Sequence, residues 1–263
     1  MKKILIIGKN SFLGLNLRSY LSKYFKVDIF SFEKMIKKDC SFFKKYSHVI
    51  NTSIHKKYIK NKYNSNHDLD KKFIKRFKKI NFIYIFLNSR KIYSPKENIS
   101  EKSKLDPCDN YAINKLKTEN FLKFKIMKNL VSLRISNVIG KRLAKKSRTN
   151  HKIFFDNFLD YRKKKNKMKI NDEFKDFITI EQFCLVVKKI IIKKVKGVYN
   201  VSLSKKIFIS EIVKWLDINF YNKITFIEER KDSFTLSNKK LLSKINEKLT
   251  KNQLKLFCEN IFK

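Results

Sequence analysis

Proline and glycine are scarce in this chain of 263 residues, which has two prolines and four glycines, and acidic residues are few. Its four cysteines lie far apart without a C-x-x-C spacing, and the four histidines do not cluster with them. This spacing indicates neither a disulfide framework nor a zinc site, and we expect no bound metal. No apolar stretch approaches the length of a membrane span, and the run at residues 4–7 is too short for a signal peptide. We therefore expect a cytoplasmic protein without a membrane span.

Basic residues dominate the charge: lysine and arginine total 63 against 23 acidic residues, which gives a net charge of +40. Such a charge can attract nucleic acid or an acidic membrane surface. The lysines, however, run through every segment instead of forming one arm or stripe, and abundant Ile, Phe and Asn are typical of A/T-rich codons. We therefore do not expect a nucleic-acid partner. The charge does predict a positive potential in any cleft, which would favour an anionic substrate.

Short apolar segments alternate with helical ones in the first half of the chain. An unbroken apolar run is typical of a strand that is covered on both faces in a parallel sheet. We expect strands at residues 4–7, 26–30, 48–53, 81–89 and 130–135. We expect helices at residues 15–24 and in a stretch that ends near residue 79, after a Lys/Asn-rich loop at residues 56–66. This alternation predicts an α/β fold, a doubly wound parallel sheet of the Rossmann type.

The alternation of strand and helix segments becomes less regular after Gly140. A basic connection at residues 141–150 leads to a less regular region, in which residues 168–177 are irregular or strand. We expect helices at residues 151–161, 180–192, 210–220 and 254–262, and a strand at residues 197–201. Ser210 would be a good N-cap for the third of these helices. The sequence therefore predicts a dinucleotide-binding domain at residues 1–150 and a smaller C-terminal substrate-binding lobe at residues 151–263, partly interleaved with the first.

A glycine turn follows the first strand and precedes a helix. In that context the helix N-terminus presents amide hydrogens to a pyrophosphate, although short glycine motifs are common and the turn alone is weak evidence. The cofactor-binding candidates in it are Gly8, Asn10, Ser11, Phe12, Leu13 and Gly14. A carboxylate at the end of the second strand would bind a ribose hydroxyl and favour NAD. Ser31 and Phe32 stand there instead, so we keep Ser31 as a candidate contact and leave both NAD and NADP open.

Tyr111 and Lys115 lie at the start of a segment that reads as helix, so the two side chains would share a face one turn apart. A free tyrosine titrates near pH 10 and is a poor base at neutrality. A neighbouring ammonium favours the phenolate and lowers that pKa, which makes the ring oxygen usable for proton transfer. Taken alone, the pair more often reflects a half-buried tyrosine and a solvated lysine.

Six segments favour the catalytic interpretation of this pair. Their sequences and order resemble those of the extended short-chain dehydrogenase/reductases, the NAD-dependent epimerase/dehydratase family acting on nucleotide sugars. Residues 8–14 resemble its G-x-x-G-F-[IL]-G loop, and residues 87–93 resemble its S-S-x-x-V-Y segment. Residues 101–119 are similar to E-x₅-P-x₃-Y-x₃-K-x₃-E, and residues 133–140 to L-R-x-x-N-V-Y-G. Residues 175–178 resemble R-D-F-I, and residues 197–201 resemble G-x-Y-N-V.

The resemblance implies roles for five side chains. Tyr111 would exchange a proton with a sugar hydroxyl during hydride transfer, Lys115 would hold the nicotinamide ribose, and Ser89 would hydrogen-bond the reacting oxygen. Asn137 and Lys175 would contact the substrate diphosphate, with Lys175 replacing an arginine and losing its planar two-pronged grip. Purely structural alternatives stay open, since Ser89 could cap a strand, Asn137 could hold a turn and Lys175 could be solvated.

Two departures from the family pattern affect the interpretation. Ser11 occupies the middle glycine position, where its side chain either crowds the cofactor or contributes a hydroxyl contact. Arg90 and Lys91 stand where the 4,6-dehydratases carry an Asp-Glu pair, which argues against dehydration. We therefore predict an NAD(P)-dependent nucleotide-sugar epimerase or 4-keto-sugar reductase of surface-polysaccharide synthesis, with a homodimer implied by the resemblance. The alternatives are a non-catalytic dinucleotide-binding protein of the same fold and a basic nucleic-acid-binding protein.

Overall fold

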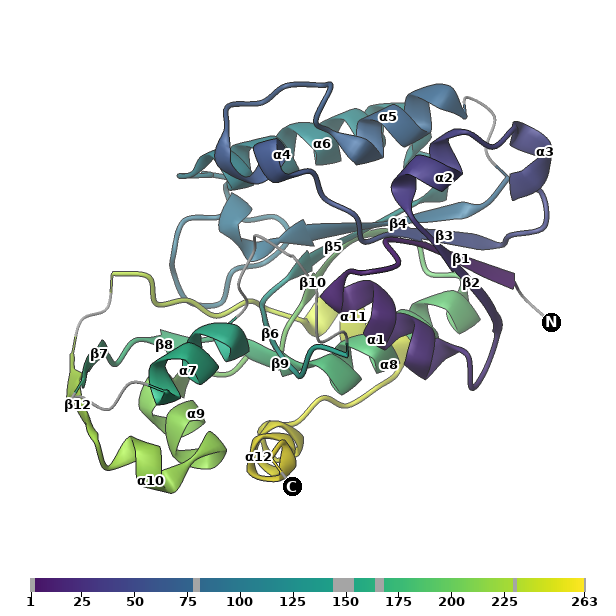
Figure 1. Cartoon of the computed structure of the whole chain (residues 1–263). Helices are drawn as coiled ribbons and strands as arrows, with labels where there is room; N and C mark the ends of the chain where they lie inside the picture. Colours follow the sequence, from purple (N-terminus) through teal and green to yellow (C-terminus); the bar gives the residue numbers. More distant parts are fainter. Residues whose placement is uncertain (1–2, 78–80, 144–153, 164–167, 229–230, 263) are drawn as a thin grey trace.

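A six-stranded sheet forms the centre of the computed structural model, which describes residues 3–77, 81–143, 154–163, 168–228 and 231–262 (Figure 1). Its strands are β1 (Lys3–Ile7), β2 (Lys26–Phe30), β3 (His48–Asn51), β4 (Ile83–Ser89), β5 (Leu130–Ile135) and β10 (Gly197–Val201). Their order is β10-β5-β4-β3-β1-β2, and all neighbouring pairs are parallel. The order reverses between β1 and β3, and open parallel sheets bind ligands at the carboxyl ends of the strands around such a point. The predicted doubly wound α/β fold is confirmed.

The sheet is apolar because helices cover both of its faces. Ile4 and Ile6 of β1 belong to one hydrophobic cluster, while Leu5 and Ile7 belong to the other, as the alternation of side chains along a strand requires. All four side chains are fully buried. The unbroken apolar run in the sequence therefore reflects a strand that lies between two helical layers.

One helical layer contains α1 (Phe12–Leu21), α8 (Ile180–Lys193) and α11 (Lys239–Ile245). The other, shown above the sheet in Figure 1, contains α2 (Phe32–Ile36), α3 (Cys40–Phe43), α4 (Lys56–Lys60), α5 (Leu69–Arg76) and α6 (Asn110–Ile126). Two short 3-10 helices, η1 (Arg90–Ile92) and η2 (Met127–Asn129), flank α6 in the chain. No described helix is both long and apolar enough to cross a bilayer.

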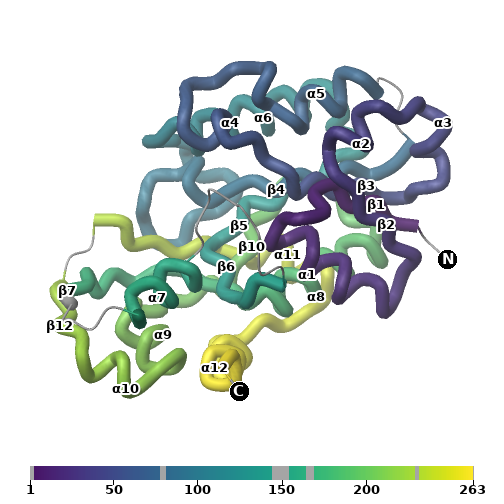
Figure 2. The backbone as a smooth tube through the Cα atoms, in the orientation of Figure 1, coloured from purple at the N-terminus to yellow at the C-terminus, as the bar shows by residue number. Residues whose placement is uncertain are grey.

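The remaining elements form an outer lobe beside the sheet (Figure 1). Its helices are α7 (Phe154–Arg162), α9 (Ile209–Leu216), α10 (Ile218–Tyr221) and α12 (Lys251–Asn260). Its short strands pair as β6 (Asn137–Ile139) with β9 (Phe177–Thr179), β7 (Met168–Asn171) with β12 (Ile224–Ile227), and β8 (Phe174–Lys175) with β11 (Ile207–Phe208). The segment after residue 230 returns from this lobe to α11 at the sheet before the chain reaches α12 (Figure 2). The second half of the chain thus contributes β10, α8 and α11 to the sheet layers.

Several predicted boundaries were wrong. The first helix begins at Phe12, and the loop expected at residues 56–66 contains α4, while α2, α3 and α11 were not predicted. The helix expected at residues 210–220 is two helices, and Ser210 does not cap either of them. Its amide and hydroxyl donate to Asp172 at 2.9 and 2.8 Å instead. Residues 144–153, which include the start of the helix expected from residue 151, lie outside the described residues, as do residues 78–80.

Candidate functional site

A cavity of about 820 Å³ lies along the carboxyl ends of β1, β3, β4 and β5. One wall comes from the residues that follow these strands, and the opposite wall comes from α7, β7 and α9 of the outer lobe. The site therefore occupies the crevice that the strand order predicts. Of the predicted cofactor contacts, Ser11, Phe12, Leu13 and Lys115 line it.

The glycine turn is tight at both of its ends. Gly8 has a φ of 126°, and a Cβ there would lie 2.3 Å from Thr52 Oγ1. A Cβ on Gly14 would lie 2.6 Å from the carbonyl oxygen of Gly8. Neither position accepts a larger residue without moving the backbone, because real Cβ atoms do not approach so closely. The turn can therefore bring α1 close to the end of β1.

Ser11 uses its hydroxyl inside this turn. Its Oγ accepts a hydrogen bond from the Gly14 amide at 2.9 Å, which caps α1, and lies 2.6 Å from Thr52 Oγ1. Helix geometry leaves the amides of Phe12 and Leu13 without an intrahelical partner, and both residues line the cavity. These amides and the positive end of α1 fit a pyrophosphate. Asn10 and Ser31, also predicted to bind the cofactor, are not among the described residues that line the cavity. The Ser31 hydroxyl instead accepts a hydrogen bond from the Lys34 amide at 3.4 Å, which caps α2.

Ser89, Tyr111 and Lys115 come together at the end of β4, and all three line the cavity. The side chains of Tyr111 and Ser89 are hydrogen-bonded. The Lys115 ammonium nitrogen donates to the carbonyl oxygen of Leu87 at 2.8 Å and lies 6.0 Å from the centroid of the Tyr111 ring. Ser89 Oγ also accepts from the Lys91 amide at 3.2 Å, so it caps η1 as well. The arrangement brings a phenol, a hydroxyl and an ammonium to the wall of one cavity.

The expected lowering of the Tyr111 pKa was wrong in direction. Burial raises the pKa of Tyr111 to about 12, the nearby carboxylate of Asp109 adds to the rise, and the hydrogen bond from Ser89 opposes it. Burial likewise lowers the pKa of Lys115, whose charge is balanced by Asp70 and Asp68. The ammonium donates to the Leu87 carbonyl and lies near buried carboxylates. Tyr111 is therefore protonated at neutral pH in this structure.

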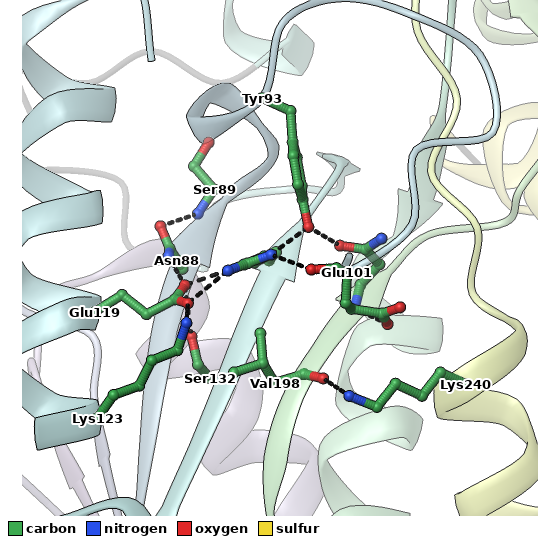
Figure 3. Close-up of polar contacts among 11 residues, drawn as sticks. Asn88, Ser89, Tyr93, Glu101, Glu119, Lys123, Ser132, Val198 and Lys240 are labelled. Carbon is green, nitrogen blue, oxygen red and sulfur yellow. Dashed lines mark hydrogen bonds and ion pairs between the residues drawn. The ribbon is translucent and has the colours of Figure 1, made fainter. Parts of the chain in front are cut away.

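A buried network fixes the strand end that carries Ser89 (Figure 3). Arg134 donates to the two carboxylate oxygens of Glu119 at 2.6 and 3.1 Å, and its Nη1 donates to the Tyr93 hydroxyl at 2.5 Å. The Asn88 amide group donates to the same Glu119 carboxylate, while its Oδ1 accepts from the Ser89 amide at 2.8 Å. Glu119 and Arg134, which contributed to the family resemblance, therefore fix the strand end that carries Ser89 and are not among the described residues that line the cavity.

Asn137 and Lys175, the predicted diphosphate contacts, both line the cavity. The Lys175 ammonium pairs with Glu173 and with Asp232, both at 2.9 Å. It is therefore not a solvated lysine, and an incoming phosphate would compete with two carboxylates for it. Arg90 pairs with the same Asp232, and Lys91 pairs with Asp109 at 2.8 Å.

Ser136 is a cavity residue that the sequence did not point out. It follows β5, is 8% exposed, and its Oγ has no hydrogen-bond partner within the described residues. A buried polar group without a partner costs about 1–3 kcal/mol. We therefore expect Ser136→Ala to raise the free energy of unfolding by about 1 kcal/mol, measured by urea denaturation.

Two other buried serines are controls for this prediction. Ser233 is also 8% exposed without a partner for its Oγ in the described chain, so Ser233→Ala should stabilise similarly. Ser132 donates to Glu119 at 3.1 Å, so Ser132→Ala should destabilise. Equal losses of stability in all three variants would contradict the prediction.

Comparisons with known proteins agree with this geometry. A model of the NAD dependent epimerase/dehydratase family matches residues 38–202, more than half of the chain. A UDP-N-acetylglucosamine 4-epimerase from Methanobrevibacter ruminantium M1, solved with UDP-N-acetylmuramic acid, is 20% identical with a TM-score of 0.79, covering 99% of this chain and 96% of that one. A dTDP-glucose 4,6-dehydratase from Bacillus anthracis str. Ames, solved with NAD, is 12% identical with a TM-score of 0.77, covering 100% and 96%.

A dTDP-4-dehydrorhamnose reductase from Clostridium acetobutylicum ATCC 824 is 18% identical with a TM-score of 0.74, covering 99% of this chain and 98% of that one. A comparison with curated proteins gave no match. At these identities the solved structures show a shared fold, and the family model adds the shared sequence pattern.

Proposed function

Because the chain belongs to the NAD dependent epimerase/dehydratase family, we propose that it is an NAD(P)-dependent enzyme acting on a nucleotide-diphosphate sugar. The reaction is epimerisation or the reduction of a 4-keto sugar, and it serves surface-polysaccharide synthesis. The observation that carries this proposal is the convergence of Ser89, Tyr111 and Lys115 in one cavity at the end of β4. Homodimer formation through α6 and the helix before it, which is usual in the family that the chain resembles, stays a prediction.

Each side chain has a role in the proposed reaction. The amides of Phe12 and Leu13 hold the pyrophosphate, and Lys115 holds the adjoining ribose. A bound nicotinamide dinucleotide supplies the hydride donor or acceptor. Tyr111 exchanges its phenolic proton with the reacting sugar oxygen, and Ser89 orients that oxygen through its hydroxyl. Asn137 and Lys175 contact the substrate diphosphate, with Lys175 leaving Glu173 or Asp232 to do so.

Tyr111 is in the protonated form that the reduction of a ketone needs. Its pKa of about 12 means that the phenol is protonated at neutral pH. A protonated phenol can donate at once to the oxygen of a carbonyl that is being reduced. Removing a proton from a sugar hydroxyl, the first step of an epimerase, requires the phenolate, and the buried site disfavours that charge. Burial of Tyr111 therefore fits the ketone-reduction step, which both candidate reactions contain, and the choice between them is left to the cofactor balance.

This difference predicts the pH dependence of the two directions. Below the pKa of Tyr111 the phenolate fraction rises with pH, so the rate of alcohol oxidation should rise about tenfold per pH unit between about pH 6.5 and 8.5. The rate of ketone reduction should stay flat over the same range, because the phenol stays protonated. Both rates can be measured by nicotinamide absorbance with one sugar nucleotide and its 4-keto form. A reductive rate that falls steeply through neutrality would contradict the prediction.

The test of the function begins with titrations of NAD and NADPH into the whole protein, followed by a screen of sugar nucleotides for each activity. Net oxidation of added NADPH selects the reductase, and isomer exchange without net oxidation selects the epimerase. Dinucleotide binding without hydride transfer to any sugar nucleotide would instead support a non-catalytic binding protein of the same fold.

A further inference from the structure

Arg90 is a buried guanidinium directly beside Ser89 in the chain. Its side chain is 8% exposed, and its Nη2 donates to both carboxylate oxygens of Asp232 at 2.7 and 2.8 Å. The guanidinium also lies over the Phe234 ring, 4.0 Å from the ring centroid. Arg90 and Asp232 both line the cavity. The guanidinium is therefore held in one orientation at the wall of the site.

Most of the hydrogen-bonding capacity of Arg90 remains unused. A guanidinium has five N–H donors in a fixed planar fork. Only Nη2 contacts Asp232, and within the described chain no hydrogen bond engages Nε or Nη1. The Asp232 carboxylate is also shared, since its Oδ2 accepts from the Lys175 ammonium at 2.9 Å. Nε and Nη1 of Arg90 can therefore donate to a second carboxylate, and arginine binds carboxylates well in this paired geometry.

The surrounding wall tolerates another negative charge. Lys91, the next residue, lines the same cavity, so two consecutive cations follow Ser89. Cations outnumber carboxylates among the lining residues. They are Arg90, Lys91, Lys115, Arg142, Lys169 and Lys175, against Glu173 and Asp232 in the lining and Asp109 and Asp156, which pair with Lys91 and Arg142 from outside it.

We propose that Arg90 binds a carboxylate on the sugar itself, so that the substrate class is a nucleotide-diphosphate sugar acid of the uronic-acid type. This inference rests on the proposed function and narrows it. Asp232 keeps its contact with Nη2, and the substrate acid binds the free donors of the fork beside it. Arg90 touches the substrate and takes no part in proton or hydride transfer.

Two variants that break the same ion pair test the proposal in opposite directions. Arg90→Gln removes the donor fork, whereas Asp232→Asn removes a neighbouring carboxylate whose negative charge repels the substrate acid. The probes are UDP-glucuronic acid and UDP-glucose, which differ in the carboxylate, with dTDP-glucose as a check on the base. Calorimetry with cofactor present gives the ratio of the two UDP-sugar affinities for each protein.

We expect wild type to prefer the acid by about 10- to 100-fold, the range of a charge-assisted hydrogen-bond pair. Arg90→Gln should bring the ratio close to one, and Asp232→Asn should raise it above the wild-type value. If Arg90 only fixes the segment that carries Asp232, both variants should lower the affinity for both sugars alike, and this result would contradict the proposal. If Arg90→Gln does not fold, Arg90→Lys keeps the charge without the fork and should also lower the ratio.

The outcomes separate this inference from the proposed function. A wild-type ratio of one, with UDP-glucose or dTDP-glucose still bound, overturns the sugar-acid assignment and leaves the function intact. Failure of all three nucleotides to bind removes the proposed function and the inference together.

Discussion

Tyr111→Phe is expected to lower turnover by about 10²- to 10⁴-fold, the contribution of a positioned acid-base group, while dinucleotide affinity stays unchanged. The substitution keeps the buried ring and removes only the phenolic oxygen that is hydrogen-bonded to Ser89. Dinucleotide affinity should persist because the amides of α1 and the ammonium of Lys115 are untouched. Turnover is measured by nicotinamide absorbance, and cofactor affinity by titration of the same preparation.

Tyr58→Phe is the matched control for this variant. Tyr58 of α4 is also buried, its ring centroid lies 5.8 Å from the Lys115 ammonium, and burial raises its pKa well above that of a free tyrosine. Its hydroxyl hydrogen-bonds Thr118 at 2.6 Å, and Tyr58 is absent from the described lining residues. Tyr58→Phe should therefore change stability more than turnover. Full turnover in Tyr111→Phe would remove the acid-base assignment.

The strands of the sheet could be predicted because a strand that is buried on both faces is apolar at nearly every position. β1 and β4 are nearly continuous apolar runs, since each of their apolar side chains packs in one of the two hydrophobic clusters. α4 was missed because its sequence, rich in lysine, buries only Tyr58. Ser210 was misplaced because its bond to Asp172 joins residues 38 apart in the chain. Sequence patterns therefore predict elements that local or repeated contacts stabilise. They do not predict the role of a residue when its main contact is with a residue far away in the chain.

The candidate site was predictable only in part for the same reason. The order of segments around Ser89, Tyr111 and Lys115 indicated which side chains would meet, and all three line the cavity. The direction of the Tyr111 pKa was not predictable, because it depends on burial by residues far away in sequence. The pairing of Arg90 with Asp232, 142 residues later, is likewise invisible in the sequence.

Arg134→Met is expected to lower the free energy of unfolding by about 1.5–3 kcal/mol, the worth of hydrogen bonds to a charged group, since the Lys123 ammonium still pairs with the buried Glu119 carboxylate. Glu119 is fully buried, and Arg134 is its bidentate partner. Although burial opposes ionisation, the hydrogen bond and charge of Arg134 lower the pKa of Glu119. Its ionised form therefore stabilises wild type above the unfolded pKa of 4.5, and this contribution is lost as the pH falls through the lowered folded pKa. Urea denaturation at several pH values measures both effects.

The double variant Arg134→Met/Glu119→Met separates stability from the positioning of the site. An apolar pair of similar volume often replaces a buried ion pair at little cost, so the double variant should regain part of the stability that the single variant loses. The recovery is incomplete because Ser132 and Asn88 lose their acceptor. The double variant still removes the acceptor that orients the Asn88 amide, and Asn88 holds the Ser89 amide at 2.8 Å. We therefore expect a stable protein with reduced turnover, since Ser89 loses the contacts that set its position next to Tyr111. Wild-type turnover in the double variant would mean that the network supports the fold alone.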